Sequence, residues 1–137
     1  MQRFDIIEHT ADTGIIAYGA DLKEAFANAA YAMFTFIADL DNVMEVVSRQ
    51  IDVQAEDVGS LLVTCLNELL YLFDTENVLY CRFEVTDFSE VRLKMNCYGE
   101  KMDPKRHEMR GGVKAATYHM LKVETNDISK VQVILDV

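Results

Sequence analysis

The stretch "FDIIEHTADTGIIAYGADLKEAF", residues 4–26, holds two short apolar runs around a polar motif, followed by the start of an amphipathic segment. Residues 3–7 and 15–18 are rich in β-prone side chains, and glycines mark the turns beside them, so two strands are predicted. The polar motif "HTAD", residues 9–12, interrupts what would otherwise be buried sheet. We therefore interpret this connection as a candidate functional segment.

Two helices are predicted from capping residues that precede apolar stripes. Asp21 opens the first helix, and Glu24 lies three residues later, which is an acidic form of the capping box. The apolar stripe then recurs at three- and four-residue steps as far as Ile37. Asp57 caps a second helix that extends to about Asp74, and its wide apolar face predicts the more deeply buried helix.

An apolar period of two predicts strands over residues 47–55, 78–85 and 91–97. A run of β-branched residues predicts the closing strand, residues 131–137. The middle two form an antiparallel hairpin, residues 99–112 form the longest loop, and residues 113–121 fit either a short helix or a strand. The predicted fold is α+β, a mainly antiparallel sheet carrying two long helices. We expect a single domain over residues 1–137.

The balance of charge narrows the classes of partner. The chain has 23 acidic residues against 13 basic ones, a formal net charge of −10. Proteins that bind nucleic acids directly need basic surface to displace counterions from phosphates, so direct RNA or DNA binding is disfavoured. A negative field of this kind attracts divalent cations and the basic surface of a protein partner.

The cysteines and the lengths of the apolar runs indicate the cellular compartment of the protein. Three widely spaced cysteines, Cys65, Cys81 and Cys97, provide neither a paired disulfide framework nor a zinc knuckle, and buried free thiols are expected. The predicted hairpin would place Cys81 opposite Cys97. The first residues lack a basic segment followed by a long apolar one, and no apolar run approaches the roughly 18 residues of a membrane span. We expect a cytoplasmic protein without a membrane partner.

Catalytic signatures with defined spacing are missing from the sequence. It contains no Walker lysine loop, G-x-S-x-G elbow, H-E-x-x-H pair or C-x-x-C pair. An enzyme is therefore less expected than a binding protein. The enzymatic alternative is a metal-dependent phosphoesterase or cyclase that uses His9, Asp12, Lys114 and His119.

Two aspartates lie at the ends of predicted strands. Asp12 follows the first strand, and Asp136 ends the closing strand, next to Val137. If these strands are neighbours, two side-chain carboxylates and the terminal carboxylate of Val137 converge and repel one another unless a cation compensates. Hard divalent ions prefer such oxygen ligands. The alternative is that Asp12 forms a turn by bonding its own backbone and that Asp136 is solvated.

Three further polar residues are candidates for contact with a partner or a nucleotide. Lys114 and His119 lie in "VKAATYH", where they could offer a cation and a titratable group to an anionic ligand. The structural alternative is that Lys114 snorkels and that His119 makes a hydrogen bond within the core. His9 is either a ligand or base, or a residue that holds its loop by hydrogen bonds.

Several motifs together resemble the archease family. They are "HTADTGIIAYG" near the start, "AFANAAYAM" on the first helix, "GE…D…H" in the long loop, "VKAATYH" after it and "ILDV" at the end. Their order and spacing agree from residue 4 to residue 137. One departure is that "ISKVQ", before the closing strand, lacks an aromatic residue that we expect in many members.

The resemblance implies a function. Archeases are expected to be non-catalytic activators of the RtcB-type RNA ligase, which joins RNA ends with GTP in tRNA splicing and RNA repair. They promote guanylylation of the ligase and its multiple turnover, and RNA is reached only through the ligase. A chaperone-like interaction domain is the remaining alternative.

The resemblance also implies a metal site and a fold. The expected cofactor is a divalent metal, calcium in the first place and magnesium or manganese as alternatives. The implied ligands are Asp12, Asp136 and the carboxylate of Val137. The implied fold is similar to the redox-independent domain of the Hsp33 chaperone.

Overall fold

The computed structural model describes residues 2–8 and 12–137. In chain order the described elements are β1 (Phe4–Glu8), β2 (Thr13–Gly19), α1 (Leu22–Ile37), the 3-10 helix η1 (Leu40–Asn42), β3 (Val47–Gln54), α2 (Val58–Glu76), β4 (Val78–Phe88), β5 (Arg92–Lys101), β6 (Ala115–Thr125) and β7 (Ser129–Asp136).

The strands form two antiparallel sheets. One has the order β1-β2-β7-β6 and the other the order β3-β5-β4. The predicted α+β class, with antiparallel strands and two long helices, is confirmed, and the structure divides the strands between two sheets. Because α1 and α2 bury apolar residues on more than one side, a single sheet could not cover them, and a second sheet closes the core.

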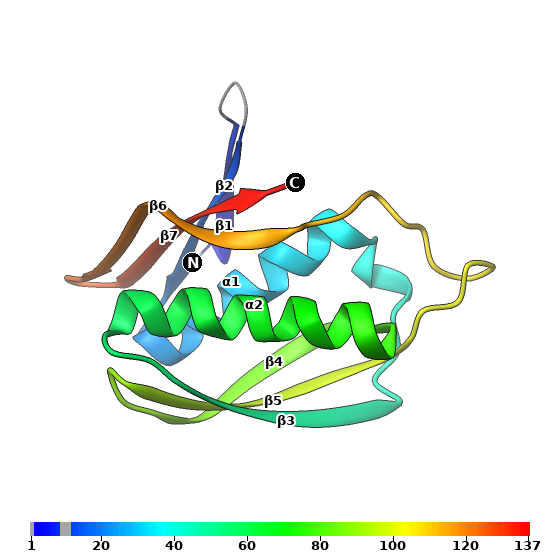
Figure 1. Ribbon diagram of the computed structural model, residues 1–137, viewed down its shortest axis with the longest axis horizontal. Helices are drawn as coiled ribbons and strands as arrows, with labels where there is room; N and C mark the ends of the chain where they lie inside the picture. Colours follow the sequence, from blue (N-terminus) through cyan, green and yellow to red (C-terminus); the bar gives the residue numbers. More distant parts are fainter. Residues whose placement is uncertain (1, 9–11) are drawn as a thin grey trace.

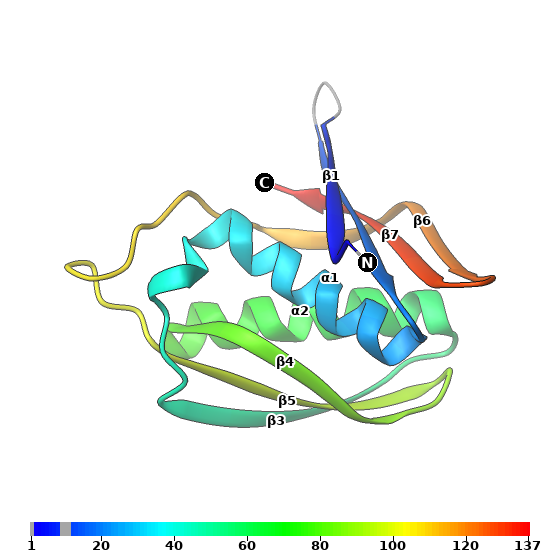
Figure 2. The ribbon, with the colours of Figure 1, turned by 180° about the vertical axis from the view of Figure 1, so that it is seen from behind.

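The helices lie between the two sheets (Figure 1). α1 packs against β2 and β7 on one side and against β4 on the other, while α2 packs against β6 and β3. Figure 2 shows from behind how α1 separates the β1–β2 hairpin from β4. The sheet that contains both chain ends is therefore held to the rest of the molecule mainly through helix contacts.

Both predicted helix starts are confirmed at the level of single hydrogen bonds. The side chain of Asp21 accepts from the N–H of Glu24 at 2.9 Å, and the side chain of Asp57 accepts from the N–H of Ser60 at 2.8 Å. These bonds satisfy N–H groups that have no partner within the helix. α2 ends at Asn77, whose φ of 59° is the left-handed conformation that asparagine tolerates.

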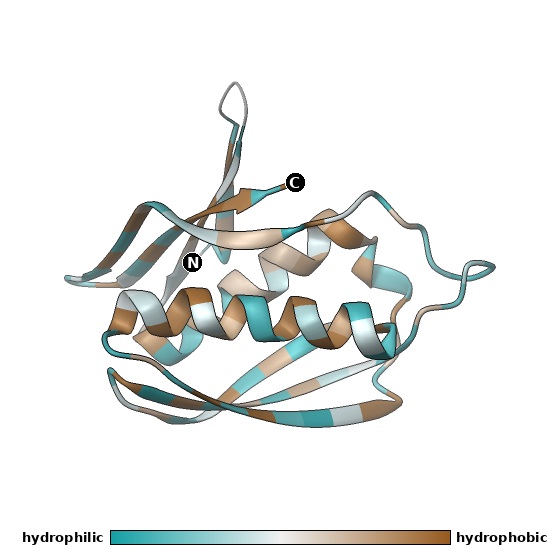
Figure 3. Cartoon of the chain, viewed as in Figure 1, coloured by the Kyte–Doolittle hydropathy of each residue, from teal (hydrophilic) through white to brown (hydrophobic). Residues whose placement is uncertain are grey.

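By length and composition alone α2 is apolar enough to cross a membrane. Its side chains Leu61, Leu66 and Leu69 are fully buried and belong to the core that the two sheets enclose. Figure 3 shows apolar residues along both helices, between the sheets. Packing within the fold therefore accounts for the hydrophobicity of α2.

The cysteines correct part of the hairpin prediction. Cys97 pairs with Phe83, and a register shift between Tyr80 and Arg82 leaves Cys81 out of the ladder, so Cys81 does not lie opposite Cys97. All three thiols are free, with Cys97 fully buried and Cys81 partly exposed. Burial raises the pKa of Cys97 to about 12, so this thiol is an inert core group.

The ambiguous segment 113–121 contributes to a strand. β6 begins at residue 115 and pairs with the closing strand β7, as an edge strand of its sheet. The predicted loop 99–112 begins later than expected, because β5 continues to residue 101. The connection between β5 and β6 therefore covers residues 102–114.

Removing the side chain of Leu66 tests the helix-centred core. Leu66 is fully buried, so Leu66→Ala leaves a cavity and should lower the free energy of unfolding by about 2–5 kcal/mol. Tyr71, on the same helix, is 61% exposed, and Tyr71→Ala should change that free energy by less than about 0.5 kcal/mol. Urea denaturation of both variants measures the difference, and equal losses would contradict the packing described for α2.

Candidate functional site

The pairing of β2 with β7 brings the beginning and the end of the chain together. The register runs from Gly19 opposite Ser129 to Thr13 opposite Leu135. Asp12 directly precedes this ladder, and Asp136 directly follows Leu135 at the end of β7. In Figure 1, β7 crosses the β1–β2 hairpin below its tip and ends to one side of it. The two strands are therefore neighbours, which is the condition that the sequence analysis set, and the convergence of the carboxylates stays a prediction.

Both aspartates belong to the same face of this sheet. A Cβ on Gly14 would lie 2.8 Å from Cδ1 of Ile134, so these paired positions share a face. Side chains alternate along a strand, which puts Asp12 and Asp136, each two residues farther on, on that face.

Lys114 is held at the same end of the sheet. Its backbone N–H donates to the carbonyl oxygen of Asp136 at 2.7 Å, and its side chain is exposed. The start of β6 is fixed to α2 by Asn67, whose side-chain amide accepts from the N–H of Ala116 at 2.8 Å and donates to its carbonyl at 3.2 Å. A rigid helix thus positions the strand that follows Lys114.

The other predicted residues are not assembled with this group. His9 lies outside the described residues. His119 lies farther along β6 with its side chain exposed, so the alternative of a hydrogen bond within the core is wrong. The phosphoesterase alternative would need both histidines beside the aspartates, and the described residues place only Asp12 and Lys114 there.

The donor chemistry at the chain ends suits a hard divalent cation. Asp12 is half-buried, Asp136 is exposed, and Val137, whose carboxylate completes the predicted set, is 51% exposed. Carboxylate oxygens are the ligands that calcium and magnesium prefer, with water filling remaining positions. Over residues 2–8 and 12–137, no three His, Cys, Asp or Glu side chains are grouped as metal ligands. A metal site here would therefore depend on the two aspartates, Val137 and water.

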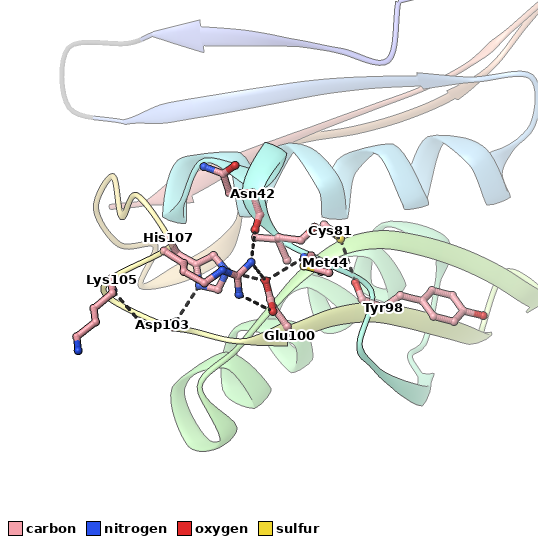
Figure 4. Close-up of polar contacts among 10 residues, drawn as sticks. Asn42, Met44, Cys81, Tyr98, Glu100, Asp103, Lys105 and His107 are labelled. Atoms are coloured by element: carbon pink, nitrogen blue, oxygen red, sulfur yellow. Dashed lines mark hydrogen bonds and ion pairs between the residues drawn. The ribbon is translucent and has the colours of Figure 1, made fainter.

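A second polar cluster, which sequence analysis missed, fixes the long connection between β5 and β6 (Figure 4). Glu100, at the end of β5, accepts from the N–H of Met44 at 3.0 Å, from Arg106 at 2.9 and 3.0 Å, and from His107 at 2.8 Å. Arg106, the Met44 N–H and His107 together lower the pKa of Glu100 to about 2. We call Glu100, Arg106 and His107 the loop anchor.

The tautomer of His107 follows from its partners. The backbone N–H of Asp103 donates to Nδ1 at 2.8 Å, so Nδ1 carries no proton. Nε2 then carries the proton and donates to Glu100. The buried imidazole is therefore neutral and joins the loop to β5. The "GE…D…H" spacing was the available signal for this cluster, but it appeared only as part of a family resemblance.

The same connection also completes α1. The backbone N–H of Arg110 donates to the carbonyl of Ile37 at 2.9 Å, and its guanidinium donates to the carbonyl of Thr35 at 3.4 Å. A cation at a helix C-terminus is favourable to the helix dipole, and the last turn of α1 has no basic residue of its own. The loop is thus attached at β5 and α1 before it reaches Lys114.

The loop anchor predicts a dependence of stability on pH. The pKa of Glu100 is lower in the folded protein than its ordinary value of 4.5, so its contribution is complete above pH 4.5 and is lost as the pH falls toward 2. Glu100→Gln should therefore be less stable than the wild type at pH 7, with the difference narrowing between pH 4.5 and 2.5. Urea unfolding at several pH values measures it.

The matched control is Glu84→Gln, which changes an exposed glutamate on β4. We expect its stability to follow that of the wild type at each pH. A Glu100→Gln difference that stays constant from pH 7 to pH 2.5 would contradict the assigned role of the Glu100 carboxylate.

Comparison with known proteins shows one family over nearly the whole chain. The model of the Archease protein family (MTH1598/TM1083) matches residues 4–137. The chain is 42% identical to protein archease of Sulfurisphaera tokodaii over 125 residues, 90% of each chain. It is 38% identical to protein archease of Methanosarcina acetivorans over an alignment of 141 positions, gaps included, which covers 99% of this chain and 97% of the relative. The name archease states no enzymatic activity.

Two solved structures share the fold. The solution structure of Methanobacterium thermoautotrophicum protein 1598 has a TM-score of 0.86 and 38% identity, and the match covers all of both chains. The crystal structure of an archease from Thermotoga maritima, described as a possible chaperone, has a TM-score of 0.66. Its identity is 21%, over 100% of this chain and 98% of that one, so this likeness concerns the fold.

Proposed function

Because this chain belongs to the archease family, we propose that it is a non-catalytic activator of an RtcB-type RNA ligase, promoting guanylylation of the ligase by GTP. The observation that supports the proposal is that the backbones of Asp12, Asp136 and Lys114 lie at one end of a sheet. None of these residues is paired with a nucleophile within the described part of the chain. A site of this kind presents charge to a partner.

Each residue has a distinct proposed task. Asp12, Asp136 and the carboxylate of Val137 would hold a divalent ion, calcium in the first place. A bound ion of this kind supplies positive charge to triphosphate oxygens. The ammonium group of Lys114 is a mobile point charge that can orient a phosphate. Positioning and charge are what phosphoryl and nucleotidyl transfer require from their surroundings.

The charge of the whole protein supports the same partner class. A protein with a net charge of −10 is attracted to the basic surface that an RNA ligase needs for its substrate. It is repelled by RNA itself, so contact with RNA would be made through the ligase. The proposed place of action is the cytoplasm, where tRNA ligation needs no membrane partner.

Guanylylation of the ligase tests the function. With GTP and an RtcB-type ligase, the wild-type protein should raise the rate of ligase guanylylation, and Asp12→Asn and Asp136→Asn should each lower that stimulation at least tenfold. Asp127→Asn, in the exposed turn between β6 and β7, is the matched control and should stimulate normally. Folded Asp12→Asn and Asp136→Asn variants with full stimulation would rule out this role for the site.

Calcium binding tests the metal site without any ligase. Titration calorimetry with calcium chloride alone should show one binding event for the wild type, and Asp136→Asn should weaken it at least tenfold, since one charged ligand is lost. Asp127→Asn should bind as the wild type does. Equal affinity in the wild type and Asp136→Asn would place any bound ion elsewhere.

The chaperone alternative has its own readout. The description of the Thermotoga maritima protein as a possible chaperone is the reason to test it. Suppression of the aggregation of unrelated unfolded proteins by the wild type and by Asp136→Asn alike, without stimulation of a ligase, would favour that alternative over the proposed function.

A further inference from the structure

A wide bulge interrupts the pairing of β6 with β7. Thr117 pairs with Ile134, and the next pair along the two strands is Lys122 with Gln132. Residues 118–121 of β6 therefore oppose Val133 alone. Bulges of this kind redirect side chains and are frequent beside functional sites. The segment Tyr118–Met120 within it is called the β6 bulge below.

The backbone of the β6 bulge is held in an unfavourable conformation. Met120 has a φ of 51°, in the left-handed region that residues other than glycine, asparagine and aspartate rarely adopt. Such a residue is strained and persists only where the surroundings impose it. This strain makes the bulge a specific feature of the fold and raises the question of what the bulge presents.

Hydrogen bonds and packing impose this conformation. The buried amide of Gln132 donates to the carbonyl of Met120 at 2.8 Å. The hydroxyl of Thr117 donates to the carbonyl of Ile134 at 2.9 Å and accepts from the N–H of His119 at 3.3 Å. On the other side Leu121 packs on α2, where a Cβ at Gly59 would lie 2.9 Å from it. The bulge is therefore pre-organised by the sheet and by α2.

The side chains of the β6 bulge are directed to solvent. Tyr118 is 60% exposed and Met120 is 45% exposed, with His119 exposed between them. The core does not use these side chains. Tyrosine and methionine are enriched at the centres of protein interfaces, and tyrosine is frequent among the residues that dominate binding energy. A rigid support for such side chains lowers the entropy cost of binding.

The position of the bulge selects the kind of partner. It lies on β6, three to five residues along the chain from Ala115, which pairs with Asp136. Carboxylates at this end and the net charge of −10 repel nucleic acids, anionic membranes and a second copy of this chain. The partner that complements an apolar projection beside carboxylates is a protein with an apolar pocket in a basic surface.

We propose that the β6 bulge is the apolar anchor by which this protein binds the ligase, with Tyr118 and Met120 as its contact side chains. This inference rests on the proposed function and adds the contact face to it. In this proposal the β6 bulge provides affinity for the ligase, whereas Asp12, Asp136 and Lys114 act on its guanylylation by GTP.

The test separates affinity from maximal stimulation. Tyr118→Ala removes the exposed ring, and Met120→Gly removes the side chain while giving the left-handed backbone a residue that adopts it without strain. Each should raise the dissociation constant for an RtcB-type ligase at least tenfold. The concentration giving half-maximal guanylylation should rise by the same factor, with the maximal rate retained at saturation. Asp136→Asn should instead leave the dissociation constant unchanged and lower the maximal rate of guanylylation.

Tyr71→Ala is the matched control, since Tyr71 is 61% exposed and lies on α2. It should bind and stimulate as the wild type does. Unchanged affinity of both folded bulge variants for a ligase that the wild type stimulates would overturn the inference. So would wild-type dimers in sedimentation that Tyr118→Ala dissociates, because the bulge would then contact a second copy. Absence of any stimulation by the wild type would instead refute the proposed function.

Discussion

The antiparallel pairing of β2 with β7 is the interaction on which the candidate site depends. It joins residues more than a hundred positions apart and ends at Thr13 opposite Leu135, next to Asp12 and Asp136. The apolar side chains Ile15 and Val133, fully buried against the helices, stabilise this pairing and determine which face each strand presents. Burial of these apolar positions therefore holds both ends of the chain at one end of the sheet.

The long connection between β5 and β6 shows how a polar segment becomes ordered. Its loop anchor replaces water around Glu100 with four charge-assisted or backbone hydrogen bonds. Arg110 then attaches the same segment to the C-terminus of α1. These contacts fix the position at which the loop ends, at Lys114. The loop anchor and the candidate site therefore follow each other along the chain.

β6 contributes to both the candidate site and the β6 bulge, but its backbone is regular at the first and irregular at the second. Near Ala115, β6 is regular and is fixed to α2 by Asn67. Beyond Thr117 the ladder opens and Met120 takes a left-handed conformation. A regular ladder suits groups that must be placed accurately, whereas a bulge moves large side chains out of the sheet toward a partner.

Local signals in the sequence determined the helices and most strands, because caps such as Asp21 and Asp57 and the two apolar periods act within a few residues. They also indicated Asp12, Asp136 and Lys114, since polar residues next to predicted apolar strands can be recognised from the sequence. The tertiary structure alone decided that two sheets enclose the helices, that Cys81 leaves the hairpin ladder, and that Glu100, Arg106 and His107 form one cluster. These outcomes depend on which strands pair and on register shifts, and register is set by the burial of distant side chains against one another.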